Sequence, residues 1–255
     1  MQTAIVRRGA VAASAVSLAL LLAACGGEDG TKDSKGEKAG GEGAKQSAPA
    51  KTQAELDKLI VAQTDLKGHS VKTPLPAELK DAKTATVDKD ECAPLNEVLV
   101  IGAPGAEGAL AARQTSRMPG EKPTSGTEDE KAEAALKALQ GASVNLITLG
   151  SYADADAAGK AMADLKKSAE SCASGFTSTV TTEKTKFAKV APASYTGGDE
   201  ALAYTVTADS PEGPMDAQLV VVRKGSEIFS VHSVSLSGKS EQPKDILEAQ
   251  LKKLG

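Results

Sequence analysis

Five segments between Gly175 and Leu236 have the composition of β-strands, and this run constrains the fold more than any other feature of the sequence. In residues 202–207, Leu, Tyr and Val alternate with Ala and Thr, as expected where one face of a sheet is buried and the other is more polar. Turn-forming residues at 210–214 and 223–226 connect consecutive segments. The sequence therefore predicts an antiparallel meander, with strands in FTSTVTT (176–182), KFAKVA (186–191), EALAYTVTAD (200–209), MDAQLVVVRKG (215–225) and SEIFSVHSVSL (226–236).

Helices are predicted before and after this run in the sequence. The clearest lies between Ser151 and Cys172, where a Ser-x-x-Asp start precedes apolar residues that recur at steps of four and three. A last helix is predicted after Pro243, with three leucines on one face that packs back on the sheet. The chain is therefore expected to be an α+β protein, an antiparallel β-sheet packed against a few helices. Further helices are predicted at 54–63, from 91 or 92 to 101 and at 128–140, and further strands at 109–117 and 143–149.

The N-terminus has the pattern of an export signal. Arg7 and Arg8 precede an apolar run at 10–24 that is too short to span a bilayer comfortably. The run ends in Leu-Ala-Ala-Cys-Gly, which resembles the lipobox of bacterial lipoproteins, in which cleavage occurs before the cysteine. Residues 1–24 are therefore expected to be a signal peptide and Cys25 the lipid attachment site; the alternative is an ordinary secretory signal cleaved elsewhere. Two or more acyl chains hold a protein stably on a membrane without crossing it.

Residues 26–50 contain no large apolar side chain, so they cannot bury enough surface to offset the entropy of ordering. We expect residues 25–50 to form a lipidated, disordered tether with a reach of roughly 25 to 30 Å. Residues 51–255 are long enough for a proper core and are expected to form a single binding or sensing domain. The expected location is the extracellular face of the cell membrane.

With Cys25 used for lipid attachment, Cys92 and Cys172 remain, an even number in an oxidising compartment. They are expected to form one disulfide. The alternative is a pair of free thiols in a metal or redox site, but the sequence has no Cys-x-x-Cys pattern and no histidine near either cysteine.

Charge and composition argue against several ligand classes. Removing Arg7 and Arg8 leaves 28 basic side chains against 34 acidic ones, a net charge near −6. A nucleic-acid-binding face needs a basic excess, so no nucleic-acid partner is expected. The chain has no Trp, three Tyr and three Phe, which also disfavours the stacked aromatic platforms that bind sugars and single strands.

The stretch VLVIGAPGAEGA (98–109) has glycines spaced as in some dinucleotide-binding loops. Such a fingerprint needs a strand before the glycines, a long helix after them and then a second strand. Here a short helix is expected before the glycines and a strand after them, so the required unit is missing. Gly102, Gly105 and Gly108 are therefore expected to be loop glycines, and no cofactor is expected.

No catalytic or metal-binding set is expected either. His232 lies in a predicted strand and is expected to be hydrogen-bonded and half-buried, whereas His69 follows Gly68 and is expected to be exposed. A hydrolase would need a nucleophile beside a base, or a buried acid–base pair, and neither is evident. Carboxylates near Asp88 and Asp154 could suggest glycoside hydrolysis or calcium binding, but helix N-termini favour acidic residues for electrostatic reasons alone.

The order of the lipobox, the tether, DECAPL (90–95), SYADADAAGKAMADLKKSAESC (151–172) and the strands through LVVVRKGSEIFSVHSV (219–234) resembles a known family. It is similar to actinobacterial lipoproteins and sensor domains related to the extracellular domain of the receptor kinase PknH. Members commonly have a second cysteine pair and a Trp shortly before the helix-ending cysteine, and this chain has neither.

The resemblance implies a helix that ends in Cys and packs on an antiparallel sheet, and a central cleft for an unidentified ligand. We therefore expect a non-catalytic, membrane-anchored domain that binds or senses a small-molecule or protein ligand. The alternative is a carrier that holds lipid or another apolar molecule in an internal cavity.

Overall fold

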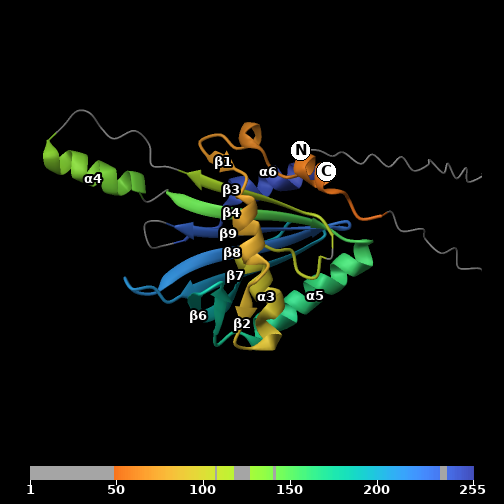
Figure 1. Ribbon diagram of the computed structural model, residues 1–255. Helices are drawn as coiled ribbons and strands as arrows, with labels where there is room; N and C mark the ends of the chain where they lie inside the picture. Colours follow the sequence, from red (N-terminus) through yellow and green to blue (C-terminus); the bar gives the residue numbers. More distant parts are fainter. Residues whose placement is uncertain (1–48, 107, 118–126, 140–141, 236–239) are drawn as a thin grey trace, which may run out of the picture. The chain divides into compact units, whose positions relative to one another are not determined.

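The computed structural model describes residues 49–106, 108–117, 127–139, 142–235 and 240–255. Within these residues, nine strands form one sheet in the order β1-β3-β4-β9-β8-β7-β6-β5-β2 (Figure 1), and neighbouring strands pair antiparallel throughout. The strands are β1 (Ser70–Lys72), β2 (Thr86–Val87), β3 (Leu110–Arg117), β4 (Ser143–Ser151), β5 (Phe176–Val180), β6 (Glu183–Ala193), β7 (Glu200–Ala208), β8 (Met215–Lys224) and β9 (Glu227–Ser235).

The predicted meander is confirmed. Strands β5 to β9 are neighbours in both sequence and space, each paired antiparallel with the next. The sheet continues because β9 also pairs with β4, with Ile147 opposite Val231, and β4 pairs with β3. The sheet ends in strands of three residues (β1) and two residues (β2).

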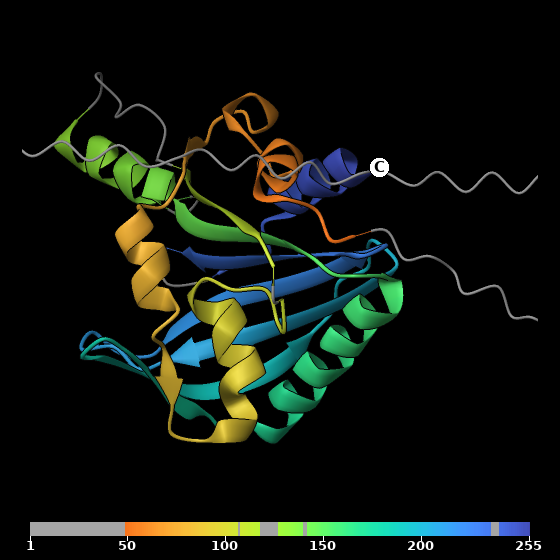
Figure 2. The same cartoon turned by 45° about the vertical axis from the view of Figure 1, so that its right-hand side comes forward.

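Helices cover both faces of the sheet. In Figures 1 and 2, α3 and α5 lie across one face, and α1 and α6 lie together on the opposite face. The fold is therefore α+β, as expected. The helical segments are α1 (Gln53–Leu59), η1 (Gln63–Asp65), α2 (Pro76–Ala82), η2 (Asp90–Cys92), α3 (Ala93–Val100), α4 (Glu128–Leu139), α5 (Ala155–Ser171) and α6 (Lys244–Leu254).

The two faces carry separate hydrophobic cores, and β8 contributes to both of them. Leu219 and Val221 pack with α3 and α5, whereas Val220 and Val222 pack with α1 and α6. All four side chains have 0% exposure. Because successive side chains of a strand point to opposite faces, a strand that is covered on both faces is continuously apolar.

The long helix α5 begins later than its sequence pattern predicts. Asp154, rather than Ser151, is the N-cap residue, and its carboxylate accepts a hydrogen bond of 2.8 Å from the Ala157 N–H. Ser151 instead ends β4, where it pairs with Glu227 of β9. A free aspartate carboxylate satisfies one of the unpaired N–H groups at a helix start.

Helix α1 is shorter than predicted, ending at Leu59 rather than Gln63. Ile60 and Val61 have 0% exposure, and the Val61 N–H donates to the side-chain oxygen of Gln250 in α6 at 3.0 Å. These contacts with the rest of the fold outweigh the local helical periodicity, because two buried β-branched side chains gain more from packing than from one more helical turn.

A disulfide joins Cys92 to Cys172 and connects the start of α3 to the end of α5. Beside it, the Ser168 hydroxyl donates to the Glu91 carbonyl at 2.6 Å and accepts from the Leu95 N–H at 3.3 Å. Helix α3 is therefore fixed to α5 by a covalent bond and by hydrogen bonds. Within the described ranges, no helix is both long and apolar enough to cross a bilayer.

Candidate ligand-binding cleft

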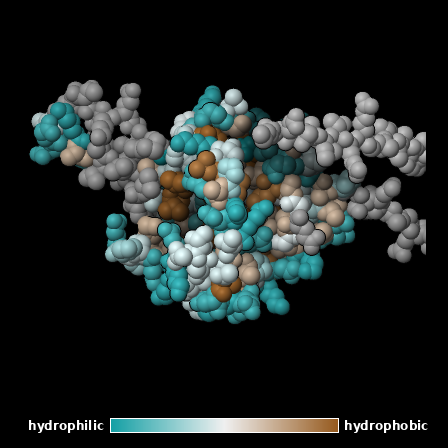
Figure 3. Space-filling view, in the orientation of Figure 1, coloured by the Kyte–Doolittle hydropathy of each residue, from teal (hydrophilic) through white to brown (hydrophobic). Residues whose placement is uncertain are grey.

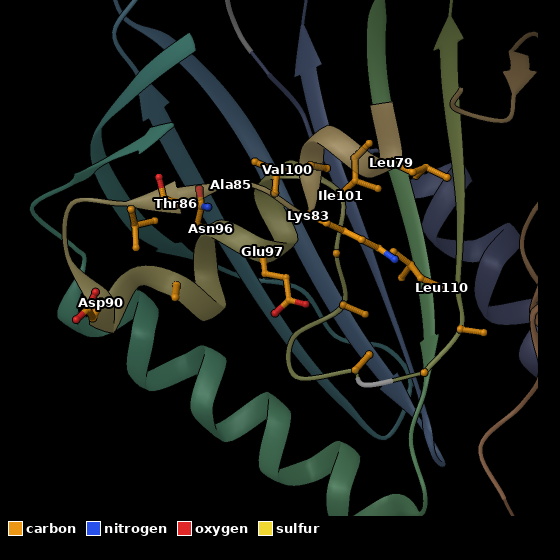
Figure 4. A pocket seen from close by; sticks show the side chains of 18 of the residues that line it. Leu79, Lys83, Ala85, Thr86, Asp90, Asn96, Glu97, Val100, Ile101 and Leu110 are labelled. Carbon is orange, nitrogen blue, oxygen red and sulfur yellow. The ribbon is translucent and has the colours of Figure 1, made fainter. Parts of the chain in front are cut away.

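A pocket of about 880 Å³ opens between helix α3, the segment from α2 to η2, and the loop that follows α3 (Figure 4). We call it the Glu97 cleft. It is lined by residues of α2, β2, η2 and α3, by the loop between Ile101 and Ala109, and by Leu110 at the start of β3. Its volume lies within the range of small-molecule sites.

Glu97 projects from α3 toward the loop, as Figure 4 shows. Among the residues that the structure describes, one donates to its carboxylate: the Gly105 N–H bonds to Oε2 at 3.3 Å. Burial raises the pKa of Glu97 above its usual range, and the Gly105 N–H offsets part of this shift. Because burial penalises the charged form, this carboxylate has lost hydration that the single hydrogen bond does not fully replace.

The glycines of the loop allow it to lie against Glu97. A Cβ at Gly102 would overlap Glu97 Cγ and lie 2.7 Å from the Glu97 carbonyl oxygen. Gly105 has a φ of 65°, a left-handed conformation that glycine adopts without strain. Gly102, Gly105 and Gly108 are loop glycines, as predicted, and the first two lie against Glu97.

Strand β4 holds the other side of this loop. The Thr148 hydroxyl donates to the Gly102 carbonyl at 2.8 Å, and the Tyr152 hydroxyl, just after β4, donates to the Pro104 carbonyl at 2.6 Å. Tyr152 is 6% exposed, and burial raises its pKa, with the nearby charge of Glu97 as the second cause. The loop is therefore bound to the sheet through its carbonyl groups.

Asn96, next to Glu97 on α3, is 3% exposed, and its Oδ1 has no hydrogen-bond partner among the described residues. Lys83 extends across the cleft from the end of α2 toward Leu110, and Asp90 lies farther along the wall in η2 (Figure 4). The described part of the chain contains no ion pair that involves Glu97.

The remaining wall of the cleft is mostly apolar. In the space-filling view of this side, apolar residues gather near the middle of the surface, with polar residues around them (Figure 3). The cleft therefore combines hydrogen-bond acceptors with apolar contact area. Its larger apolar lining residues are Leu79, Val87, Val100, Ile101 and Leu110.

The prediction that His69 is exposed is wrong. His69 is 7% exposed, and its Nε2 lies 2.9 Å from Oδ2 of Asp245 at the start of α6. Arg117 of β3 pairs with the same Asp245 carboxylate, which also lines a second, more polar pocket of about 770 Å³. The long-range contact with α6 buries this histidine, and no local signal near Gly68 reveals it.

His232 is half-buried in β9, as predicted. The Leu99 backbone forms a hydrogen bond with its ring, and its Nε2 is buried with no partner among the described residues. Burial lowers the pKa of His232 to about 4, because the charged ring would lose its hydration. The histidine is therefore neutral at physiological pH.

The acidic residues considered from the sequence have structural partners. Asp88 accepts from the Thr177 N–H at 2.8 Å, which joins the segment after β2 to β5, and Asp154 caps α5. Over the residues described, no group of three or more His, Cys, Asp or Glu side chains is placed to hold a metal ion. The predicted lipid attachment site, Cys25, lies outside the described residues.

The sequence analysis did not identify Asn96 and Glu97 as site residues. The available signal was a polar pair inside the apolar stretch PLNEVLV (94–100). Such a pair also occurs on the solvated side of many short helices. Only the position of the loop makes it part of a cleft.

The chain resembles known proteins over most of its length. The family described as the PknH-like extracellular domain matches residues 52–253. The crystal structure of the extracellular domain of PknH from Mycobacterium tuberculosis matches with a TM-score of 0.51 at 14% identity, covering 82% of this chain and 98% of that one. A putative uncharacterized protein from Mycobacterium smegmatis has a TM-score of 0.31 at 10% identity, covering 79% and 94%. No curated protein matches the chain.

Proposed function

Because this chain belongs to the family of PknH-like extracellular domains, we propose that it is the sensing domain of a membrane-anchored lipoprotein and that its ligand binds in the Glu97 cleft. The observation that carries the proposal is the cleft itself, which combines apolar walls with a partly buried carboxylate. Such a combination is typical of sites that bind a small molecule through contact area and orient it through a few polar groups.

The proposed role is non-catalytic binding. Two hydroxyl groups beside the cleft already have structural partners: the Tyr152 hydroxyl donates to Pro104 and the Thr148 hydroxyl to Gly102. Donors committed to the loop in this way fix the shape of the wall. A preformed wall favours binding because little conformational entropy is lost when the ligand enters.

Anchoring through Cys25 would place the domain on the outer face of the membrane, at the end of a tether. The start of the described chain is firmly attached to the sheet: the Lys51 N–H donates to the Ser151 hydroxyl at 3.0 Å, and the Lys51 ammonium pairs with Glu227. A tether that precedes this point would therefore join the domain beside the end of β4 and the start of β9.

The test is native mass spectrometry of the protein purified from its own host. We expect a retained small molecule that is lost in Ala93→Trp, in which an indole fills the wall of the cleft. The matched control is Ala163→Trp, since Ala163 is an exposed alanine on α5, away from the cleft. The proposal fails if Ala93→Trp retains the molecule as well as the wild type does.

The apolar lining residues of the cleft also support a second candidate function: a carrier for lipid or another apolar molecule. The same experiment separates the two, because a carrier would release a molecule with the mass of a membrane lipid. A sensor would release a smaller, more polar compound. Loss of a bound lipid in Ala93→Trp would identify the cleft as the carrier site.

A further inference from the structure

We propose that the Glu97 cleft selects an amphiphilic cation, a ligand with an ammonium group attached to an apolar chain or ring. This inference rests on the proposed function and adds the class of ligand. Three features of the cleft support it: the acceptor capacity of Glu97, the charges of the described lining residues and the apolar wall.

The Glu97 carboxylate can accept more hydrogen bonds than the described residues donate to it. A carboxylate can accept about four hydrogen bonds. From the described residues Glu97 receives one, donated by the Gly105 N–H at 3.3 Å. The neighbouring Asn96 Oδ1 receives none from the described residues, although the residue is only 3% exposed. The Glu97 carboxylate therefore has acceptor capacity left for a ligand, and an ammonium group supplies three donors.

The described side chains around Glu97 leave the cleft with an excess of negative charge. The charged or ionisable groups around Glu97 are Lys83 from α2, Asp90 from η2 and Tyr152 after β4. Lys83 extends toward Leu110 and forms no ion pair with Glu97, and Tyr152 donates to Pro104 (Figure 4). Counted as formal charges, Glu97 and Asp90 against Lys83 give the described lining residues one more negative charge than positive charge. A bound cation would restore the favourable interactions that burial removes from the carboxylate.

The wall of the Glu97 cleft includes several apolar side chains. Leu79, Val100 and Ile101 lie on the side of the cleft above Glu97 and offer contact area to an alkyl chain or ring (Figure 4). A bare inorganic cation would leave this area unused. An organic ammonium ion can use the carboxylate and the apolar wall together, because its charged and apolar parts are covalently joined.

The experiment titrates the ¹⁵N-labelled domain with hexylammonium, hexanol and hexanoate, three probes with the same alkyl chain. The Gly102 and Gly105 amide signals report on the cleft. We expect hexylammonium to bind roughly tenfold more tightly than hexanol, because a charge-assisted hydrogen bond exceeds a neutral one. Hexanoate should bind most weakly, since its charge repels Glu97.

The test variant is Glu97→Gln, and the matched control is Glu91→Gln, which removes an exposed acidic side chain outside the cleft. Glu97→Gln should bind hexylammonium no better than hexanol, whereas Glu91→Gln should keep the preference. If Glu97→Gln does not fold, the wild type supplies the second measurement. Its affinity for hexylammonium should rise with pH as the Glu97 carboxyl signal titrates, while its affinity for hexanol should not.

Equal affinities for hexylammonium and hexanol would overturn the inference and leave the proposed ligand site intact. Stronger binding of hexanoate would also overturn it, in favour of an anionic ligand recognised by Lys83. If none of the probes moves the Gly102 and Gly105 signals, both the cation preference and the placement of the ligand in this cleft are wrong.

Discussion

Gly102 determines how closely the loop approaches Glu97, since a Cβ there would overlap the Glu97 side chain and lie 2.7 Å from its carbonyl oxygen. We expect Gly102→Ala to lower the free energy of unfolding by about 1–3 kcal/mol, the usual cost of overpacking, and to shift the Gly105 amide signal. Urea denaturation and amide spectra measure the two effects.

Gly108 provides the matched control, because no atom lies within 4 Å of a Cβ built at this position. Gly108→Ala should change the free energy of unfolding by less than about 1 kcal/mol, since it adds no clash. Equal destabilisation by the two substitutions would show that the contact with Glu97 does not limit the residue at position 102.

His232 should make the fold sensitive to acid. In the folded protein, burial lowers its pKa from 6.5 to about 4, so between these pH values the unfolded chain binds more protons. The contribution of His232 is therefore complete above about pH 6.5 and decreases as the pH falls toward 4, by up to about 3 kcal/mol.

Carboxyl groups also titrate in this range, so the measurement compares the wild type with His232→Gln. Urea denaturation at about pH 7 and at about pH 4.5 should show a smaller acid-induced loss in the variant, because glutamine takes up no proton. An equal loss in both proteins would mean that the ring of His232 titrates normally in the folded state.

Residue environments were the least predictable part of the molecule. The sequence places Glu97 on a short helix and His69 after a glycine, and nothing local distinguishes either from a solvated residue. Glu97 is partly buried because the loop that ends at Leu110 folds back over α3, and His69 because α6 brings Asp245 to it across the sheet. Both environments come from residues distant in the sequence or from the path of a loop.

The disulfide between Cys92 and Cys172 joins helices α3 and α5 and should stabilise their packing. Cys92 and Cys172 both have 0% exposure, and their disulfide closes a loop with a sequence separation of 80 residues. Replacing both cysteines with alanine should lower the free energy of unfolding by up to about 4 kcal/mol, according to the chain-entropy model. It should also loosen α3, which carries Glu97.

Urea denaturation measures the loss of stability, and hydrogen exchange of the α3 amides measures the loosening. The control is the wild-type protein under reducing conditions, which should behave like the double variant if the disulfide is reduced. Unchanged exchange in α3 would mean that the hydrogen bonds of Ser168 with Glu91 and Leu95 are sufficient to hold the helix.

Periodicity predicted the elements whose burial follows a simple repeat. Helix α5 buries Ala158, Met162, Leu165 and Ala169 on one stripe, and turn signals separate the β-rich segments of the β5–β9 meander, so both were identified. The short segments were not: β1 and β2 are too brief to show a repeat, and the short helix α2, with Pro76 at its first position, was not predicted. Proline costs little there, because its missing N–H would be unpaired anyway.

At the scale of the whole molecule, the sequence predicts a lipid anchor at Cys25. The wild-type chain expressed in its host should partition into the detergent phase of a Triton X-114 extraction, because two acyl chains give stable membrane association. Cys25→Ala should move to the aqueous phase, whereas the Cys92 and Cys172 double alanine variant should stay with the detergent. Retention of Cys25→Ala in the detergent phase would contradict the anchor.

The sheet order was only partly predictable. Turn signals connect neighbouring strands within the meander, but the β4–β9 pair joins segments about eighty residues apart, and no local pattern specifies it. The pairing follows from burial on both faces: Ile147 and Leu149 of β4 extend the core formed by Val231 and Phe229 of β9. This match between the apolar side chains of β4 and β9 becomes apparent only when the sheet and its covering helices are assembled.

The two outermost strands, with three and two residues, would have a further consequence if the proposed lipid anchor holds the protein on a membrane. Tethering many copies to one leaflet raises their two-dimensional concentration, which favours polymerisation through strand addition. An edge this short offers too few free backbone groups to template another chain. The domain should therefore stay monodisperse at densities where a longer bare edge would drive fibre growth.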